Sequence, residues 1–179
     1  ALRGMSLDIP AGQFVTVIGS NGAGKSTFLN AISGDQTVDS GRIAIDGVDV
    51  TRMPVWARAE RVARVFQDPM AGTCEDLTIE ENMALAQRQA VSLLMAALQP
   101  SRILLLDEHT AALDPRTADF VLRLTERIVA ESQLTTMMVT HSMRQALDVG
   151  ERTVMLHQGQ VVLDVSGEER SRLDVPDLL

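Results

Sequence analysis

The most constraining stretch of the chain is a run of nine residues from Gly19 to Thr27, Gly-Ser-Asn-Gly-Ala-Gly-Lys-Ser-Thr. An apolar segment from Phe14 to Ile18 leads into this run, and residues 28–32 can continue from it as a helix. A glycine-rich turn between a strand and a helix can present consecutive backbone N–H groups, because glycine adopts conformations that other residues avoid. The helix N-terminus adds unpaired donors and the positive end of its dipole. The run fits the pattern G-x-x-x-x-G-K-[ST], and it therefore predicts a loop that binds phosphate groups.

Two side chains of this loop have defined chemical roles in that interpretation. Lys25 is expected to reach the β- and γ-phosphates of a nucleotide, and the Ser26 hydroxyl to bind Mg²⁺. The other residues expected around the phosphates are Ser20, Asn21, Gly22, Ala23, Gly24 and Thr27. The alternative is a glycine-rich turn that matches the pattern by accident, which the flanking strand and helix disfavour.

Composition excludes several classes of protein. The chain has 179 residues, enough for one substantial core, and contains no apolar run of the 18 or more residues that a membrane helix requires. A net charge of -8 disfavours nucleic acid as the main partner, because binding a phosphate backbone needs clustered Lys and Arg. The single Cys74 excludes an internal disulfide, and the first residues resemble no signal peptide, so a reducing, cytoplasmic setting is expected.

Apolar runs and turn signals predict strands that alternate with helices. Strands are expected within 41–50, 62–66, 103–106, 136–140, 153–157 and 161–165, and helices within 54–61, from 79, within 92–98 and from 115. The segment Ile103 to Leu106 is wholly apolar, as in a parallel strand covered on both faces. This order predicts the α/β class, with a mainly parallel sheet flanked by helices and an antiparallel β addition.

Polar residues that follow these strands are candidates for catalysis. Asp107 and Glu108 come directly after the apolar run, so Asp107 is expected to hold the Mg²⁺ shell and Glu108 to orient water for attack on the γ-phosphate. Two solvated carboxylates at a strand end are the alternative. Gln67 and His141 follow two other strands and can reach the same phosphate across the sheet's carboxyl edge, although either alone is more often an ordinary loop residue.

In this order, the motifs resemble those of the ATP-binding-cassette ATPases over nearly the whole chain. The matches are Walker A at Gly19 to Thr27, the Q-loop at Gln67, Walker B with its glutamate at Ile103 to Glu108, the D-loop at Ala111 to Asp114 and the switch histidine at His141. The resemblance implies a P-loop NTPase that binds ATP and Mg²⁺. It also implies that Gln67 senses Mg²⁺ and a membrane partner, that His141 contacts the γ-phosphate and that Asp114 lies at a dimer interface.

The chain departs from the family pattern at three places. His109 stands where the family usually carries proline. The signature Leu-Ser-Gly-Gly-Gln is absent except for Gln87, and only 40 positions separate Gln67 from Asp107. We therefore expect that several tens of residues, including most of a helical subdomain, are missing between Ala86 and Gln87, through either omission or deletion. An N-terminal strand with an adenine-stacking aromatic residue is expected upstream of Leu2.

The resemblance implies one nucleotide-binding domain over residues 1–179, the ATPase subunit of a transporter and in particular of an importer. Such a subunit works as a head-to-tail dimer with a second copy, peripheral on the cytoplasmic face of a membrane. Its partners are permease subunits and, indirectly, a solute-binding protein, with no nucleic acid expected. Two alternatives stay open: a soluble cassette ATPase of translation or DNA repair, and a non-catalytic nucleotide-binding module if the signature segment is truly deleted.

Overall fold

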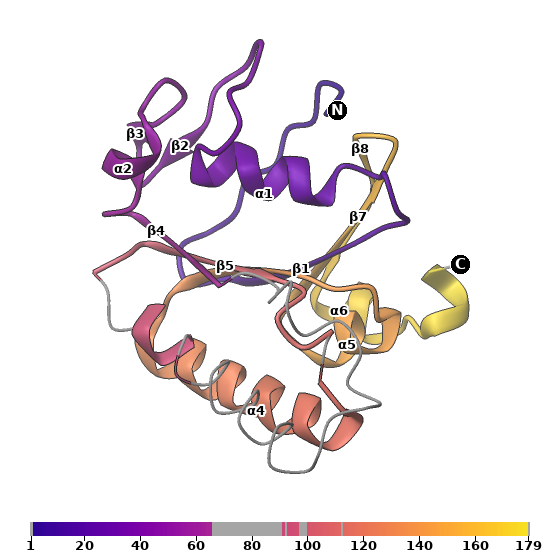
Figure 1. Ribbon diagram of the computed structural model, residues 1–179. Helices are drawn as coiled ribbons and strands as arrows, with labels where there is room; N and C mark the ends of the chain where they lie inside the picture. Colours follow the sequence, from indigo (N-terminus) through magenta and orange to yellow (C-terminus); the bar gives the residue numbers. More distant parts are fainter. Residues whose placement is uncertain (1, 66–90, 92, 97–99, 112, 179) are drawn as a thin grey trace.

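A six-stranded sheet forms the centre of the molecule in the computed structural model, which describes residues 2–65, 91, 93–96, 100–111 and 113–178 (Figure 1). The strands lie in the order β4-β5-β6-β1-β7-β8. They span Val62–Val65 (β4), Ile103–Asp107 (β5), Thr135–Val139 (β6), Phe14–Ile18 (β1), Arg152–His157 (β7) and Gln160–Ser166 (β8). The first five are parallel and β8 pairs antiparallel with β7, which confirms the expected fold class.

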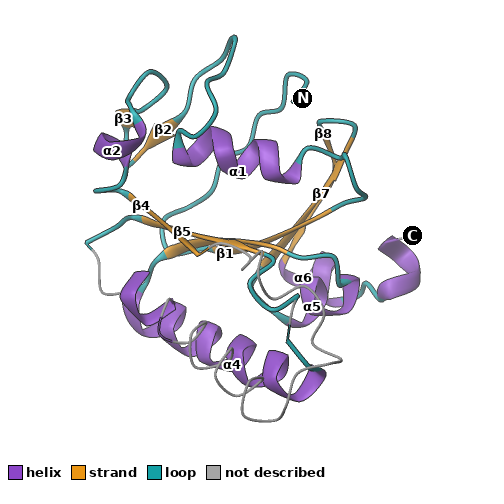
Figure 2. Cartoon of the chain, viewed as in Figure 1, coloured by secondary structure: helices purple, strands orange, loops and turns teal. Residues whose placement is uncertain are grey.

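Helices cover both faces of the sheet (Figure 2). Helix α1 (Lys25–Ser33) lies on one face, together with α2 (Val55–Arg58) and the small hairpin of β2 (Ala44–Ile45) and β3 (Val48–Asp49). On the other face lie α4 (Pro115–Ser132), α5 (Met143–Asp148) and α6 (Gly167–Ser171), and the chain continues into a 3-10 turn, η3 (Val175–Leu178). None of the helices in these described ranges is long and apolar enough to cross a membrane.

The apolar run in β5 contributes to both cores. Leu105 belongs to the core that contains Leu29 of α1, whereas Leu104 and Leu106 belong to the core that contains Leu122 of α4. All three β5 leucines are fully buried, because successive side chains of a strand point to opposite faces and both faces are covered. The sheet thus holds the carboxyl ends of β1, β5 and β6 at one edge, where the polar residues of the predicted site begin.

Most local signals in the sequence correspond to elements of the fold. Asp46 and Gly47, both with positive φ, form the turn between β2 and β3. The Asp114 carboxylate accepts hydrogen bonds from the backbone N–H groups of Arg116 and Thr117, and so caps α4 as predicted. The short helices α5, α6 and η3 were not predicted. The helices expected from residue 79 and within 92–98 lie wholly or partly outside the described residues.

Candidate functional site

The predicted phosphate loop connects β1 to α1 with three glycines at positive φ. Gly19, Gly22 and Gly24 have φ values of 149°, 78° and 107°. A Cβ atom on Gly19 would lie 2.3 Å from the Leu156 carbonyl oxygen, so no other residue fits there without moving β7. Gly24 occupies the N-cap of α1 in the left-handed conformation. The loop therefore has the conformation that directs backbone N–H groups and a helix N-terminus at one point.

A cavity of about 300 Å³ opens above this loop. The residues that line it are Asn21, Gly22, Ala23, Gly24, Lys25, Ser26, Thr27, Glu108 and His141. Side chains that lie more than 80 positions apart in the sequence thus meet at one edge of the sheet, as the sequence predicted. Among the predicted phosphate-loop residues, Ser20 is not part of the lining, but its carbonyl oxygen accepts a hydrogen bond from Lys25.

Lys25 is held inside its own loop. Its Nζ atom donates to the carbonyl oxygens of Gly19, at 2.7 Å, and Ser20, at 3.2 Å, and the residue is only 6% exposed. Burial lowers the pKa of the ammonium group, and the negative charges of Glu108 and Asp107 partly offset this shift. A cation at this position attracts an anionic group into the cavity, and the anion would replace the two carbonyl oxygens as its partner.

Glu108 and His141 form a pair across the ends of β5 and β6. The Glu108 Oε1 atom lies 2.6 Å from the His141 Nε2 atom, and the Glu108 side chain is less exposed than that of His141. The backbone N–H of Glu108 donates to the carbonyl oxygen of Val139, and Glu108 has a φ of 48°. A positive φ is uncommon for a residue other than glycine, and such conformations concentrate at functional sites. The carboxylate therefore has a fixed orientation at the cavity wall.

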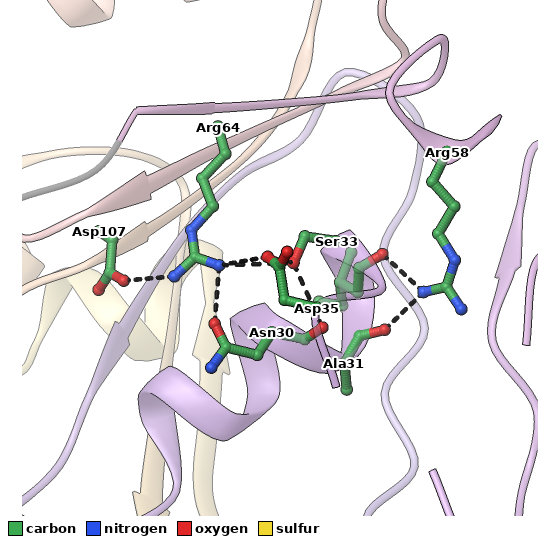
Figure 3. A network of polar contacts seen from close by, with 8 residues as sticks. Asn30, Ala31, Ser33, Asp35, Arg58, Arg64 and Asp107 are labelled. Carbon is green, nitrogen blue, oxygen red and sulfur yellow. Dashed lines mark hydrogen bonds and ion pairs between the residues drawn. The ribbon is translucent and has the colours of Figure 1, made fainter. Parts of the chain in front are cut away.

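Asp107 lies beside the cavity, outside its lining residues, with its carboxylate bound by an arginine. Its Oδ2 atom accepts a hydrogen bond of 2.7 Å from Arg64 of β4 (Figure 3). Arg64 was not among the predicted site residues. A signal for it was present, because an arginine in the otherwise apolar strand Val62 to Val65 needs a buried partner.

The donor set fits Mg²⁺. No group of three or more His, Cys, Asp or Glu side chains that could hold a metal ion occurs among the residues described by the structure. Mg²⁺ needs no such group, since it commonly binds one or two protein oxygens together with phosphate oxygens and waters. The Ser26 hydroxyl in the first turn of α1 and the Asp107 carboxylate at the end of β5 supply oxygens of that kind. Gln67, the third predicted ligand, lies outside the described residues.

His109 follows Glu108 directly, but it is not among the residues that line the cavity. It is 2% exposed, and its Nε2 atom lies 3.1 Å from the Thr125 Oγ1 atom of α4. Burial lowers the pKa of its imidazole to about 4, so the ring is neutral near pH 7. His109 therefore connects the end of β5 to α4.

Comparison with known proteins identifies close relatives. A family profile described as ABC transporter matches residues 2–85. The chain is 41% identical to a tyrosine transport ATP-binding protein of Clostridioides difficile, over 98% of this chain and 88% of that protein. It is 34% identical to an aliphatic sulfonates import ATP-binding protein of Agrobacterium fabrum, over 93% of this chain and 74% of that protein.

Solved structures agree in fold. The dimeric post-hydrolysis state of the ATP-binding cassette MJ0796 with ADP and Pi superposes with a TM-score of 0.74 at 24% identity, covering 92% of this chain and 90% of the other. The cbiO1 component of a Clostridium perfringens ABC transporter complex gives a TM-score of 0.76 at 21% identity, covering 99% and 90%. At these identities the structural similarity shows the P-loop cassette fold and gives no information on the roles of the residues in the site.

Proposed function

Since the chain belongs to the ATP-binding subunits of ATP-binding-cassette transporters, an ATPase family that couples hydrolysis to transport, we propose that it energises import, and that its cargo is an amino acid. The relative described as a tyrosine transport protein matches nearly the whole chain at 41% identity, and further relatives are named as importers of sulfonates and methionine. The convergence of the phosphate loop, Glu108 and His141 on one cavity carries the ATPase part of this proposal, and the relative at 41% identity supports the amino-acid cargo.

The geometry supports a division of roles within that cavity. The loop N–H groups, Lys25 and Thr27 hold the phosphates of ATP, while Ser26, Asp107 and Gln67 are the proposed Mg²⁺ ligands. Bound Mg²⁺ supplies neutralisation of phosphate charge. Glu108 accepts the proton of the attacking water, and His141, 2.6 Å from it, keeps the carboxylate in place and reaches the γ-phosphate. Gln67 is the proposed third catalytic residue.

The proposed partners follow from the family. Residues 1–179 form one nucleotide-binding domain that pairs head to tail with a second copy, with Asp114 at the interface. The pair lies on the cytoplasmic face of a membrane, in contact with permease subunits. A solute-binding protein delivers the solute to these permease subunits. In this arrangement each ATP is enclosed by both copies, so hydrolysis depends on dimer closure.

We propose further that a segment is missing between Ala86 and Gln87. Two findings support this: the family profile match ends at residue 85, and the alignment with the C. difficile relative extends over 220 residues although the chain has 179. At least 41 positions of that alignment therefore have no residue of this chain. An intact mass measured on protein from the native gene tests this directly. A mass well above 19.4 kDa would show that the protein contains a segment that the 179-residue sequence omits, whereas a mass near 19.4 kDa would show that the segment is deleted from the protein.

The transport assignment is tested by uptake. In cells that lack the gene, uptake of radiolabelled tyrosine is expected to fall and to return with the wild-type gene but not with Glu108→Gln. Glu131→Gln, an exposed change on α4, is the matched control and should restore uptake. If tyrosine uptake is unchanged and sulfonate uptake is reduced, the cargo is a sulfonate and the amino-acid proposal is wrong. Purification with ribosomes or DNA, and normal uptake of every solute tested, would contradict a transporter role.

A further inference from the structure

A buried arginine connects three elements next to the proposed Mg²⁺ site. Arg64 of β4 has a side chain that is 9% exposed and lies between β5 and α1 (Figure 3). One terminal nitrogen donates to Asp107 Oδ2 at 2.7 Å. The other donates to Asn30 Oδ1 of α1 at 2.7 Å and to Asp35 Oδ2, just beyond α1, at 3.1 Å.

These contacts use the planar fork of the guanidinium. Its two terminal nitrogens face different elements, so one side chain holds α1 and β5 in a fixed relation. A lysine, with a single ammonium on a flexible stem, could not serve both directions equally. Charge-assisted hydrogen bonds of this length are stronger than neutral ones, and burial reduces their screening by solvent.

The charges of the cluster favour a cation at its edge. Arg64 is paired with two carboxylates, those of Asp35 and Asp107, so the three side chains carry one net negative charge. The Arg64 contact uses one oxygen of Asp107, and an ionised carboxylate has acceptor capacity beyond a single hydrogen bond. Asp107 is thereby oriented while it retains the capacity to bind metal.

We propose that Arg64 is a positioning residue for the Mg²⁺ site, a step that depends on the proposed Mg²⁺ roles of Ser26 and Asp107. Ser26 belongs to the first turn of α1 and Asp107 to the end of β5, and Arg64 ties these two elements together. It therefore sets the relation between the two halves of the site. Arg64 is not among the residues that line the cavity, and its hydrogen bond to Asp107 is the contact through which we expect it to act.

This role differs from that of a purely structural arginine in a measurable way. If Arg64 only stabilises the fold, its loss affects nucleotide binding equally with and without Mg²⁺. If it positions Asp107, its loss weakens the binding of Mg²⁺ and leaves nucleotide binding without metal intact, because Lys25 and the loop N–H groups remain in place.

The test uses Arg64→Met in the full chain, with ADP as the nucleotide so that no hydrolysis occurs. ADP affinity is measured by calorimetry in EDTA and in Mg²⁺, and Mn²⁺ binding to the ADP complex is measured by electron paramagnetic resonance. We expect Mn²⁺ and Mg²⁺ affinity to fall by about tenfold or more, as for other residues that orient metal ligands, with ADP affinity in EDTA changed less than about twofold. Arg42→Met removes an exposed arginine paired with Asp49 and should change neither value.

Two further variants keep the test decisive. Arg64→Lys retains the charge without the fork and Asn30→Ala removes the α1 contact alone, so each is expected to lose part of the metal affinity even if Arg64→Met does not fold. Equal losses with and without metal, wild-type metal affinity in the folded variants, or tighter metal binding would each overturn the proposal. Ser26→Ala and Asp107→Asn distinguish failure of the Arg64 proposal from failure of the Mg²⁺ site on which it depends. If these two variants also bind metal normally, the proposed Mg²⁺ site itself is wrong.

Discussion

The Nε2 atom of His109 lies 3.1 Å from the Oγ1 atom of Thr125, and both side chains are buried. The Thr125 hydroxyl donates to the Val121 carbonyl oxygen at 2.8 Å, so it accepts from His109. This network assigns the proton of the neutral imidazole to Nε2. Where the family usually carries proline, this chain has a side chain that attaches the residue after Glu108 to α4.

Acid is therefore expected to destabilise the protein through His109. Its pKa is about 4 in the folded state because of burial, and about 6.5 in the unfolded chain. Between these values the unfolded chain binds the proton and the folded protein does not, so stability falls as the pH drops from 6.5 to 4. At pH 4.5 this amounts to about 2 kcal/mol relative to pH 7.

Urea unfolding at pH 7 and pH 4.5 checks this expectation. His109→Gln keeps a donor for Thr125 and should lose about 2 kcal/mol less than the wild type over that interval. His157→Gln changes an exposed histidine at the β7–β8 turn and should follow the wild type. If His109→Gln and the wild type lose equal stability, the buried imidazole does not contribute.

Glu108→Gln is expected to uncouple binding from hydrolysis. The amide keeps the size of the side chain and a contact with His141, but it cannot accept the proton of water. Phosphate release should fall by about 100-fold or more, while ATP binding persists and size-exclusion chromatography with ATP shows a trapped dimer. Normal turnover in this variant would remove Glu108 from its assigned role, and Glu131→Gln controls for loss of one carboxylate.

Arg58 is expected to matter for stability rather than chemistry. It is 2% exposed and donates to the carbonyl oxygens of Ala31, at 2.6 Å, and Ile32, at 3.0 Å, where α1 ends. Arg58→Leu leaves these acceptors without a donor and should lower the free energy of unfolding by about 3 kcal/mol. Arg102→Leu removes an exposed arginine and should cost less than about 1 kcal/mol. Thermal unfolding compares the two, and equal shifts would contradict the assignment.

The sequence predicted those features that depend on neighbouring residues. The apolar run before Asp107, the glycines before Lys25 and the Asp114-Pro115 start of α4 each have a local physical cause, and each appears in the structure. Partners that lie far apart in the sequence could not be read in the same way. Arg64 and Asp107 are 43 positions apart and depend on β4 pairing with β5, which no local pattern specifies.

Helix α5 is another element that the sequence did not predict. Its six residues are too few for a periodic pattern, although Ser142 caps it by accepting a hydrogen bond from the backbone N–H of Gln145. The pairing of Glu108 with His141 was foreseen only as a meeting at one sheet edge. Its 2.6 Å contact and the positive φ of Glu108 could not be read from a local pattern, because they occur where β5 pairs with β6, a strand more than 25 positions further along the chain.

Lys25→Met is expected to weaken nucleotide binding strongly while leaving the fold nearly as stable. The Nζ atom bridges the Gly19 and Ser20 carbonyl oxygens, so an incoming phosphate must offer a stronger partner than these two neutral acceptors. Methionine fills the same space without a charge, and ADP affinity should fall by about 30- to 100-fold, the equivalent of about 2–3 kcal/mol. Burial already disfavours the ammonium group, and the two carbonyl oxygens that lose their donor belong to the loop that lines the cavity, where water can replace it. The free energy of unfolding should therefore change by less than about 1 kcal/mol, in contrast to the fully buried acceptors of Arg58. Calorimetry with ADP and thermal unfolding measure the two effects. Nucleotide affinity near that of the wild type would show that the loop N–H groups suffice and that Lys25 has no binding role.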